Sequence, residues 1–260
     1  MKQILTIAGS DSGGGAGIQA DIKSIHANGG FAMSVITSVT AQNTCEVTSA
    51  FDLPIEIIEA QIDAVFSDFE VSAVKTGMLS SAKIVQVVAK KLHQYSPTKI
   101  VVDPVMVSKS GFPLLQESAI ETIISNLIPL ATVLTPNVHE AQLLSGMKIQ
   151  NVKEAKVAAE KIHQLGCHSV LVKGGHMEDE TSIDVLFSEN KFQFFESERI
   201  NTKNTHGTGC TYSAAIATQL GLGKDLFSSI ESAKDYITNA IRHSLAIGHG
   251  HGPTNHFYFL

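Results

Sequence analysis

The sequence contains no tryptophan and only three cysteines among its 260 residues. The cysteines, Cys45, Cys167 and Cys210, are odd in number, widely spaced and without a C-x-x-C pair. This pattern argues against a disulfide framework and against a zinc-thiolate site, and it is typical of a reducing compartment. We therefore expect a cytoplasmic protein, and we interpret Cys45 and Cys167 as structural because neither lies in a catalytic motif.

The chain is also short of positive charge and of long apolar runs. It carries 19 Lys and Arg against 25 Asp and Glu, a formal charge of -6, which argues against a nucleic-acid partner but allows a local basic pocket. No stretch approaches the roughly 18 apolar residues of a membrane span, and the opening residues lack a signal-peptide core. With 43% hydrophobic residues, we expect a globular protein without a membrane partner.

Short apolar runs alternate with helical patterns. The runs are continuous, as in strands buried on both faces of a parallel sheet, and lie at 4–8, 32–36, 71–74, 100–102, 132–134 and 170–172. Helical periodicity follows Pro54 and recurs at 80–93, 116–127, 151–165, 209–220 and 224–247. Residues 182–198 predict an antiparallel hairpin. This order indicates an α/β fold in a single domain, residues 1–260, with helices on both faces of a mostly parallel sheet.

A glycine-rich segment at 9–17 directly follows the first predicted strand. Glycine turns let a ligand approach the backbone closely, and the next helix offers free N–H groups in its first turn. The segment lacks the Gly-Lys-Ser/Thr ending of a Walker A loop, and Ile18 occupies the third glycine position of a G-x-G-x-x-G motif. Five glycines within nine residues favour a ligand site over a plain strand-to-helix turn.

A second glycine motif, 204–211, opens a predicted apolar helix. Successive N–H groups at a helix start form an anion-binding site. We expect Cys210 in the first turn, where the helix dipole favours the thiolate over its reference pKa of about 8.5. A buried structural cysteine is the alternative, and this motif alone leaves both open.

Three further polar motifs each follow a different predicted strand, at 103–111, 137–140 and 173–176. Asp103 also fits an N-cap or an ordinary turn, and Asn137 with Glu140 also fits a helix capping box. Because the carboxyl ends of parallel strands meet at one sheet edge, we interpret the convergence of these motifs as one active site.

Two histidines, His249 and His251, lie among glycines near the end of the chain. They fit either a metal-binding tract or a flexible glycine-rich segment. No cysteine or carboxylate accompanies them in ligand spacing, which favours the second interpretation.

Taken together, these motifs resemble those of the hydroxymethylpyrimidine/phosphomethylpyrimidine kinase family, a branch of the ribokinase superfamily. The resemblance covers nearly the whole chain in order, and the long opening motif with Gln42-Asn43-Thr44 is typical of the pyrimidine branch. The segments that carry it are 8–21, 41–44, 75–79, 103–106, 135–137, 173–176 and 204–210.

The resemblance implies a ribokinase-like three-layer α/β/α sandwich and two ATP-dependent phosphorylations at one site, in thiamin biosynthesis. The first converts 4-amino-5-hydroxymethyl-2-methylpyrimidine to its monophosphate, and the second converts the monophosphate to the diphosphate. Carried over to this sequence, the implied pyrimidine contacts are Gly9, Asp21, Gln42, Met78 and Val105.

The resemblance also implies which residues bind ATP and Mg²⁺ and which catalyse phosphoryl transfer. It implies ATP contacts at Lys173, Thr208 and Asn137, and a Mg²⁺ site at Asp103 and Glu140. The implied catalytic group is the anion hole with its cysteine, Gly207, Thr208, Gly209 and Cys210. Sugar kinases of the superfamily have an aspartate base where this chain has Cys210.

The chemistry of the two substrates separates the roles of Cys210 and Gln42. An alcohol must lose a proton to attack ATP, whereas a phosphate monoester is already mostly anionic, so only the first step needs Cys210 as a base. An aminopyrimidine presents an amino donor beside a ring-nitrogen acceptor, which the Gln42 carboxamide matches. We therefore expect Gln42 to select the ring.

Two alternatives stay open. Many of the same motifs would serve a pyridoxal or pyridoxine kinase of the same fold. A nucleotide-binding regulator with a decayed site is the second alternative, against which the intact Cys210, Asn137, Glu140 and Lys173 argue. The partners that we expect are the small-molecule substrates, ATP and a second copy of the chain in a homodimer.

Overall fold

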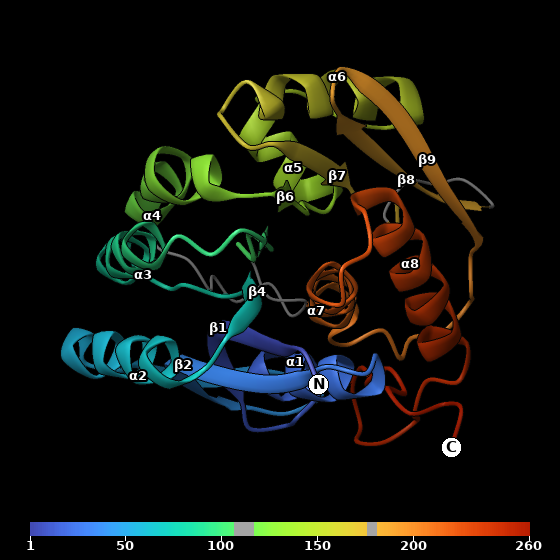
Figure 1. Ribbon diagram of the computed structural model, residues 1–260. Coiled ribbons are helices and arrows are strands. Elements are labelled where there is room, and N and C mark those ends of the chain that lie inside the picture. The colour runs from blue at the N-terminus through green and yellow to red at the C-terminus, as the bar shows by residue number, and fades with distance from the viewer. Residues whose placement is uncertain (107–116, 176–180) are drawn as a thin grey trace.

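A nine-stranded sheet forms the centre of the computed structural model, which describes residues 1–106, 117–175 and 181–260 (Figure 1). The strand order is β3-β2-β1-β4-β5-β6-β7-β8-β9. The strands are β1 Gln3–Asp11, β2 Phe31–Gln42, β3 Val47–Asp52, β4 Val71–Thr76, β5 Ile100–Val102, β6 Val133–Leu134, β7 Ser169–Val172, β8 Thr181–Ser188 and β9 Lys191–Glu198.

The sheet is parallel in its centre and antiparallel at both edges. Strands β2, β1, β4, β5, β6 and β7 pair in parallel, whereas β3, β8 and β9 pair antiparallel. The six predicted strands and the predicted hairpin are confirmed. β3 is an additional strand, which lacks an apolar run because residues 48–51 of this edge strand are exposed.

The helices are α1 Gly17–Ala27, α2 Ile55–Asp68, α3 Ala82–Tyr95, α4 Glu117–Thr122, α5 Val138–Ser145, α6 Val152–His163, α7 Thr208–Gly221 and α8 Leu226–Arg242. A π-helical turn at Ile123–Leu127 and a 3₁₀ turn at Ile128–Leu130 follow α4. The last helix ends five residues before the predicted end at 247, because the chain turns back there and the N–H of Leu245 donates to the carbonyl oxygen of Pro253.

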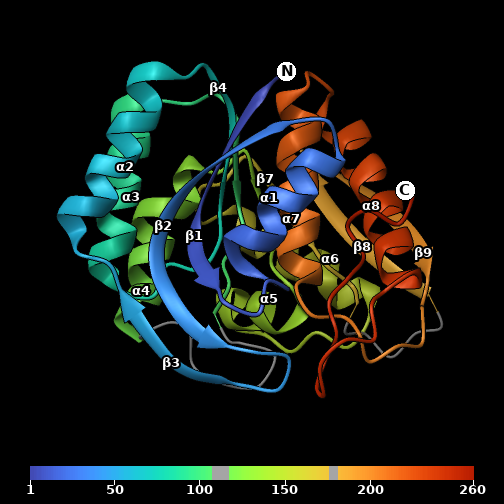
Figure 2. The same ribbon diagram turned by 90° about the horizontal axis from the view of Figure 1, so that it is seen from below.

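Two hydrophobic cores lie on opposite faces of the sheet. Along β1, Leu5 points into the core that α2–α6 cover, and Ile4 points into the core that α1, α7 and α8 cover. Figure 2 shows α2 and α3 on one side of the sheet and α1, α7 and α8 on the other. The predicted three-layer α/β/α sandwich is therefore confirmed. Within the described residues, every helix is too short or too polar to cross a membrane.

The glycine-rich segment after α8 is hydrogen-bonded to the loops beside the sheet edge. The N–H of His251 donates to the carbonyl oxygen of Thr44 at 2.9 Å, and the N–H of Gly252 donates to Asn204 Oδ1 at 3.1 Å. Among the described residues there is no cluster of three or more potential metal ligands. The segment therefore links the loops that contain Thr44 and Asn204.

Candidate active site

A cavity of about 1290 Å³ lies at the carboxyl ends of β1, β4, β5, β6 and β7. The convergence of motifs that the sequence predicts is found there. Twelve of the thirteen implied site residues line this cavity, and they are Gly9, Gln42, Met78, Asp103, Val105, Asn137, Glu140, Lys173, Gly207, Thr208, Gly209 and Cys210. Residues 107–111 and His176 of two predicted motifs lie outside the described part of the chain.

Asp21 is the exception, because it does not line the cavity. Its side chain is fully buried on α1, where it accepts a hydrogen bond from the hydroxyl of Thr6 at 2.6 Å and forms an ion pair with Lys75 at 2.8 Å. An ion pair without solvent access uses both carboxylate oxygens within the protein. In this structure Asp21 therefore contacts Lys75 and Thr6 rather than the cavity, and its implied contact with the pyrimidine stays a prediction.

The anion-hole motif forms the first turn of α7, as predicted. Gly207 is the N-cap with a φ of 75°, and a Cβ there would lie 1.8 Å from the carbonyl oxygen of Gly15. The two glycine-rich loops thus contact each other backbone to backbone. A Cβ on Gly209 would have ordinary contacts, at 3.5 Å from Lys173 Nζ and 3.7 Å from Asp103 Oδ2. Gly209 therefore faces the charged end of the cavity.

Cys210 lies in the first turn of α7, but its thiol is not activated. Burial raises the pKa of Cys210 to about 11, although the nearby Lys75 ammonium opposes this shift. The expected lowering of the pKa by the helix dipole is wrong, because loss of hydration outweighs it at this partly buried position. The thiol is consequently protonated at neutral pH.

Lys75 and Lys173 bring positive charge to the cavity. Burial alone would lower the pKa of Lys75, but the negative charge of Asp21 outweighs it, so the pKa is raised. Lys173 lies 2.9 Å from Asp103 Oδ1, and the hydroxyl of Ser213 on α7 donates to Asp103 Oδ2 at 3.0 Å. Each lysine is thus paired with an aspartate, and the cavity wall carries charges of both signs.

Asn137 and Glu140 form a capping box at the start of α5. The N–H of Glu140 donates to Asn137 Oδ1 at 3.0 Å, and the N–H of Asn137 donates to Glu140 Oε2 at 2.8 Å. The cap that the sequence offered as an alternative is thus real, and it leaves both residues on the cavity wall. Burial raises the pKa of the Glu140 carboxyl group.

The carboxyl groups of Asp103 and Glu140 suit a hard cation. Mg²⁺ prefers oxygen ligands and commonly takes one or two carboxylates, with waters and substrate phosphates completing its shell. Two carboxylates on one cavity wall fit that requirement, whereas no described cluster would hold a metal with protein ligands alone.

Another part of the cavity wall includes Gly9, Gln42 and Met78. A Cβ on Gly9 would lie 2.4 Å from the Met78 methyl group, so a glycine is needed for Met78 to pack there. The amide of Gln42 lies 3.3 Å from His206 Nε2. His206 in turn lies 3.1 Å from Asp11 Oδ2. Asp11 and His206 each lie inside one of the two glycine motifs, but the motifs alone predict no role for either residue.

A second polar cluster was missed entirely. Asp184 on β8 accepts hydrogen bonds from the N–H of Gly174 at 2.8 Å, from the hydroxyl of Tyr212 at 3.0 Å and from Lys234 Nζ at 2.8 Å. These residues come from the hairpin, α7 and α8, which no motif connects. Their contacts fix the backbone that follows Lys173.

Comparison with known proteins identifies the family. The sequence profile described as phosphomethylpyrimidine kinase matches residues 11–255. The chain belongs to this family. A hydroxymethylpyrimidine/phosphomethylpyrimidine kinase of Haemophilus influenzae is 46% identical over 100% of the chain and 98% of its own length. The family that the sequence motifs predict is confirmed.

A longer relative and two solved structures are also similar to the chain. A thiamine biosynthesis bifunctional protein of Geobacter sulfurreducens is 49% identical, and the chain covers 52% of its length. Among solved structures, a phosphomethylpyrimidine kinase of Clostridium difficile is 47% identical with a TM-score of 0.83, over 93% of this chain and all of that one. An ADP complex of Bacillus subtilis pyridoxal kinase is 38% identical with a TM-score of 0.93, over 100% of this chain and 98% of that one.

Proposed function

We propose that the chain is a bifunctional kinase that transfers a phosphoryl group from ATP to 4-amino-5-hydroxymethyl-2-methylpyrimidine and then to the resulting monophosphate. One observation carries this proposal. A single cavity is lined both by Gly9, Gln42 and Met78, the proposed ring end, and by the start of α7 and Lys173, the proposed phosphate end. A ring held at the first end directs its substituent toward the second.

The ring end supplies recognition. The carboxamide of Gln42 offers one acceptor and one donor, which match the amino group and the adjacent ring nitrogen of the substrate. Met78 and Val105 border the same space and provide apolar contact for the ring. A site built for such a pair penalises rings that leave its polar groups unpaired.

The other end supplies phosphate binding. Phosphoryl transfer depends mainly on positioning and electrostatic stabilisation. The first N–H groups of α7, from Gly207 to Cys210, provide partial positive charge, and Lys173 provides a full charge. Asn137 and Thr208 also border the space for ATP.

Cys210 has a role only in the first step. The alcohol must lose its proton, and the nearby Lys75 ammonium favours the Cys210 thiolate electrostatically. The phosphate monoester of the second step is already anionic and needs no base. The high pKa of this thiol makes proton acceptance strongly dependent on pH.

We also propose that the reaction requires Mg²⁺. The ion neutralises charge on the phosphates of ATP, and Asp103 and Glu140 are the residues that would hold it. Lys173, which pairs with Asp103, keeps a second positive charge beside the same phosphates.

A pyridoxal kinase is the second candidate, favoured by the TM-score of 0.93 to the Bacillus subtilis enzyme. Both activities would use the same phosphate end. They differ at the ring, because pyridoxal has a hydroxyl group and lacks the amino–nitrogen pair that Gln42 would bind.

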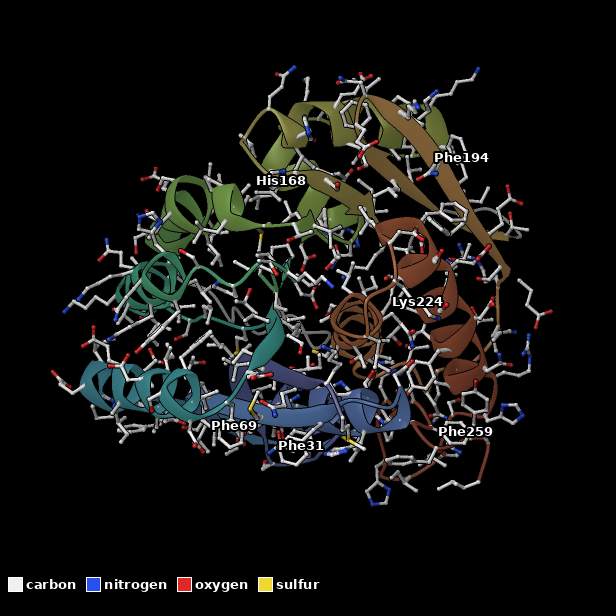
Figure 3. The ribbon with its side chains drawn as sticks, viewed as in Figure 1. Phe31, Phe69, His168, Phe194, Lys224 and Phe259 are labelled. Atoms are coloured by element: carbon white, nitrogen blue, oxygen red, sulfur yellow. The ribbon has the colours of Figure 1, made fainter. Side chains whose placement is uncertain are left out.

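We further propose a single domain over residues 1–260 and a homodimer. One sheet includes strands from both halves of the sequence, which supports one domain. At its edge, Val39 and Phe51 are paired across β2 and β3 and are 44% and 67% exposed. Figure 3 shows Phe31, at the start of β2, also on the surface. An exposed apolar edge suits pairing with a second copy, and Phe51→Lys should shift the sedimentation coefficient to that of a monomer.

The test of the proposed function is product analysis. The protein is incubated with ATP, Mg²⁺ and the aminopyrimidine alcohol, and products are followed by mass spectrometry. We expect the monophosphate first and the diphosphate later. A pyridoxal phosphate product without pyrimidine products would instead support the second candidate.

A further inference from the structure

Thr40, Gln42, Asp11 and His206 form a hydrogen-bonded chain at the ring end of the cavity. The Nε2 atom of His206 lies 3.1 Å from Asp11 Oδ2 and 3.3 Å from the nearer end of the Gln42 amide. The Thr40 hydroxyl oxygen lies 3.1 Å from the other end of the same amide. Gln42 is thus held between two side chains that have no role in the proposed function.

The hydrogen bonds of Asp11 determine where the proton of His206 lies. Asp11 accepts the backbone N–H groups of Gly13 at 2.8 Å, Gly15 at 3.1 Å and Ala16 at 2.8 Å. Burial alone would raise the pKa of Asp11, but these bonds and His206 outweigh it and lower the pKa. Because the ionised carboxylate only accepts, the Nε2 atom of His206 carries a hydrogen and donates it to Asp11.

The same reasoning determines the orientation of the Gln42 amide. Since the protonated Nε2 of His206 has no lone pair to accept from the amide nitrogen, the end of the amide that faces it has to be Oε1, which shares with Asp11 the single Nε2 hydrogen. The Thr40 hydroxyl has a single hydrogen, which it donates to the carbonyl oxygen of Ser10 at 2.9 Å, so it accepts from the amide nitrogen. The two ends of the amide exchange by a half-turn, and only this orientation gives every donor an acceptor.

The imidazole of His206 is itself fixed from several sides. The backbone N–H of His206 donates to the carbonyl oxygen of Gly252 at 3.0 Å, and its carbonyl oxygen accepts the N–H of Thr254 at 3.4 Å. A Cβ on Gly15 would lie 2.3 Å from His206 Cδ2, so this glycine makes room for the ring. The C-terminal segment and the first glycine loop therefore hold the histidine against Asp11.

We propose that His206 and Thr40 are positioning residues that lock the Gln42 amide in one orientation, and that this lock selects among pyrimidines. The proposal rests on the proposed function. The locked amide keeps one lone pair on Oε1 and one hydrogen on Nε2, in a fixed order. A 4-aminopyrimidine offers the matching donor and acceptor. The 4-oxo analogue offers a carbonyl acceptor and a ring N–H donor, which is the reverse order, and it is therefore rejected.

The test compares kcat/KM for the 4-amino alcohol and its 4-oxo analogue. We expect the wild-type protein to prefer the amino compound at least about 100-fold. In His206→Ala and in Thr40→Val, the freed amide can turn to match either ring, so this preference should fall at least about tenfold while the KM for ATP stays within about twofold. His206→Gln restores an N–H donor and should keep most of the preference. His168→Ala, which removes an exposed histidine on the outer surface (Figure 3), should change neither value.

Dissociation constants of the two alcohols, measured by calorimetry without ATP, separate the lock from the proposed function. Absence of any pyrimidine turnover by the wild-type protein would refute the proposed function, and the ratio of dissociation constants would still test the lock. The same amino-to-oxo ratio in the wild-type protein, His206→Ala and Thr40→Val would refute the lock. A fall in this ratio in both variants, with His206→Gln close to the wild-type value, would support it.

Discussion

The Nζ atom of Lys75 lies 2.8 Å from Oδ2 of Asp21, and neither side chain is exposed to solvent. This buried ion pair links α1 to the end of β4 directly beneath the cavity. Lys75 lines the cavity, whereas Asp21 does not. Asp21 therefore acts on the site through Lys75, whose positive charge lies close enough to Cys210 to oppose the rise in its pKa.

Replacing Asp21 by Asn should destabilise the fold. The change leaves the Lys75 ammonium buried without a carboxylate, which typically costs about 3–5 kcal/mol of unfolding free energy. Urea unfolding measures this loss. Glu59→Gln is the matched control, because Glu59 pairs at 3.3 Å with Lys90, whose side chain is 71% exposed, so its loss should stay at about 1 kcal/mol or less. Unchanged stability of Asp21→Asn together with a raised KM for the pyrimidine would indicate that Asp21 contacts the substrate.

Gly207 and Gly209 should respond differently to alanine. At Gly207 the φ is positive, and an added Cβ would lie 1.8 Å from the carbonyl oxygen of Gly15. Gly207→Ala should therefore lower both the melting temperature and kcat. At Gly209 the added methyl group has ordinary contacts, so the melting temperature should hold while kcat falls, because the methyl group enters the anion hole. Equal kcat values for Gly209→Ala and the wild-type protein would mean that Gly209 does not border the phosphate-binding site.

Cys210 predicts different pH profiles for the two phosphorylations. The pKa of Cys210 is about 11, so the fraction of thiolate rises about tenfold with each pH unit through the neutral range. The rate of the first step should rise by the same factor. The second step should stay flat above pH ~6, the second pKa of its phosphate.

Cys210→Ala tests the same assignment. It should remove the pH slope of the first step and reduce that step about 100- to 10,000-fold, with a much smaller effect on the second. Each step is measured separately, starting from the alcohol or from the monophosphate. Equal losses in both steps would show that Cys210 shapes the anion hole rather than accepting a proton.

Removing Mg²⁺ should stop both phosphorylations. Turnover is measured in excess EDTA and again after Mg²⁺ is restored. Asp103→Asn and Glu140→Gln should each raise the Mg²⁺ concentration that gives half-maximal rate, whereas Asp225→Asn, at the exposed cap of α8, should not. Full turnover in EDTA would contradict the metal assignment.

Most of the architecture could be predicted because buried parallel strands leave continuous apolar runs. The edge strand β3 could not, since residues 48–51 face solvent and need no apolar side chains. The end of the last helix was placed too late, because the turn back at Leu245 is set by its bond to Pro253, a tertiary contact.

Asp103 and Lys173 could be placed at the candidate site from the sequence, because each directly follows a predicted strand. It was not predictable where burial decides the chemistry. The sequence places Cys210 at a helix start, but only the packed structure shows that burial raises its pKa. Likewise, Asp21 and Asp184 find their lysine partners on distant elements, and such pairings leave no local pattern.

The ring specificity of Gln42 decides whether this cavity is built for an aminopyrimidine. The measurement is kcat/KM of Gln42→Met and of the wild-type protein, on the aminopyrimidine alcohol and on pyridoxal in parallel. We predict a loss of at least about 1–3 kcal/mol in transition-state stabilisation for the pyrimidine and a smaller loss for pyridoxal. Unchanged pyrimidine turnover, or an equal loss with pyridoxal, would show that Gln42 does not select the aminopyrimidine ring.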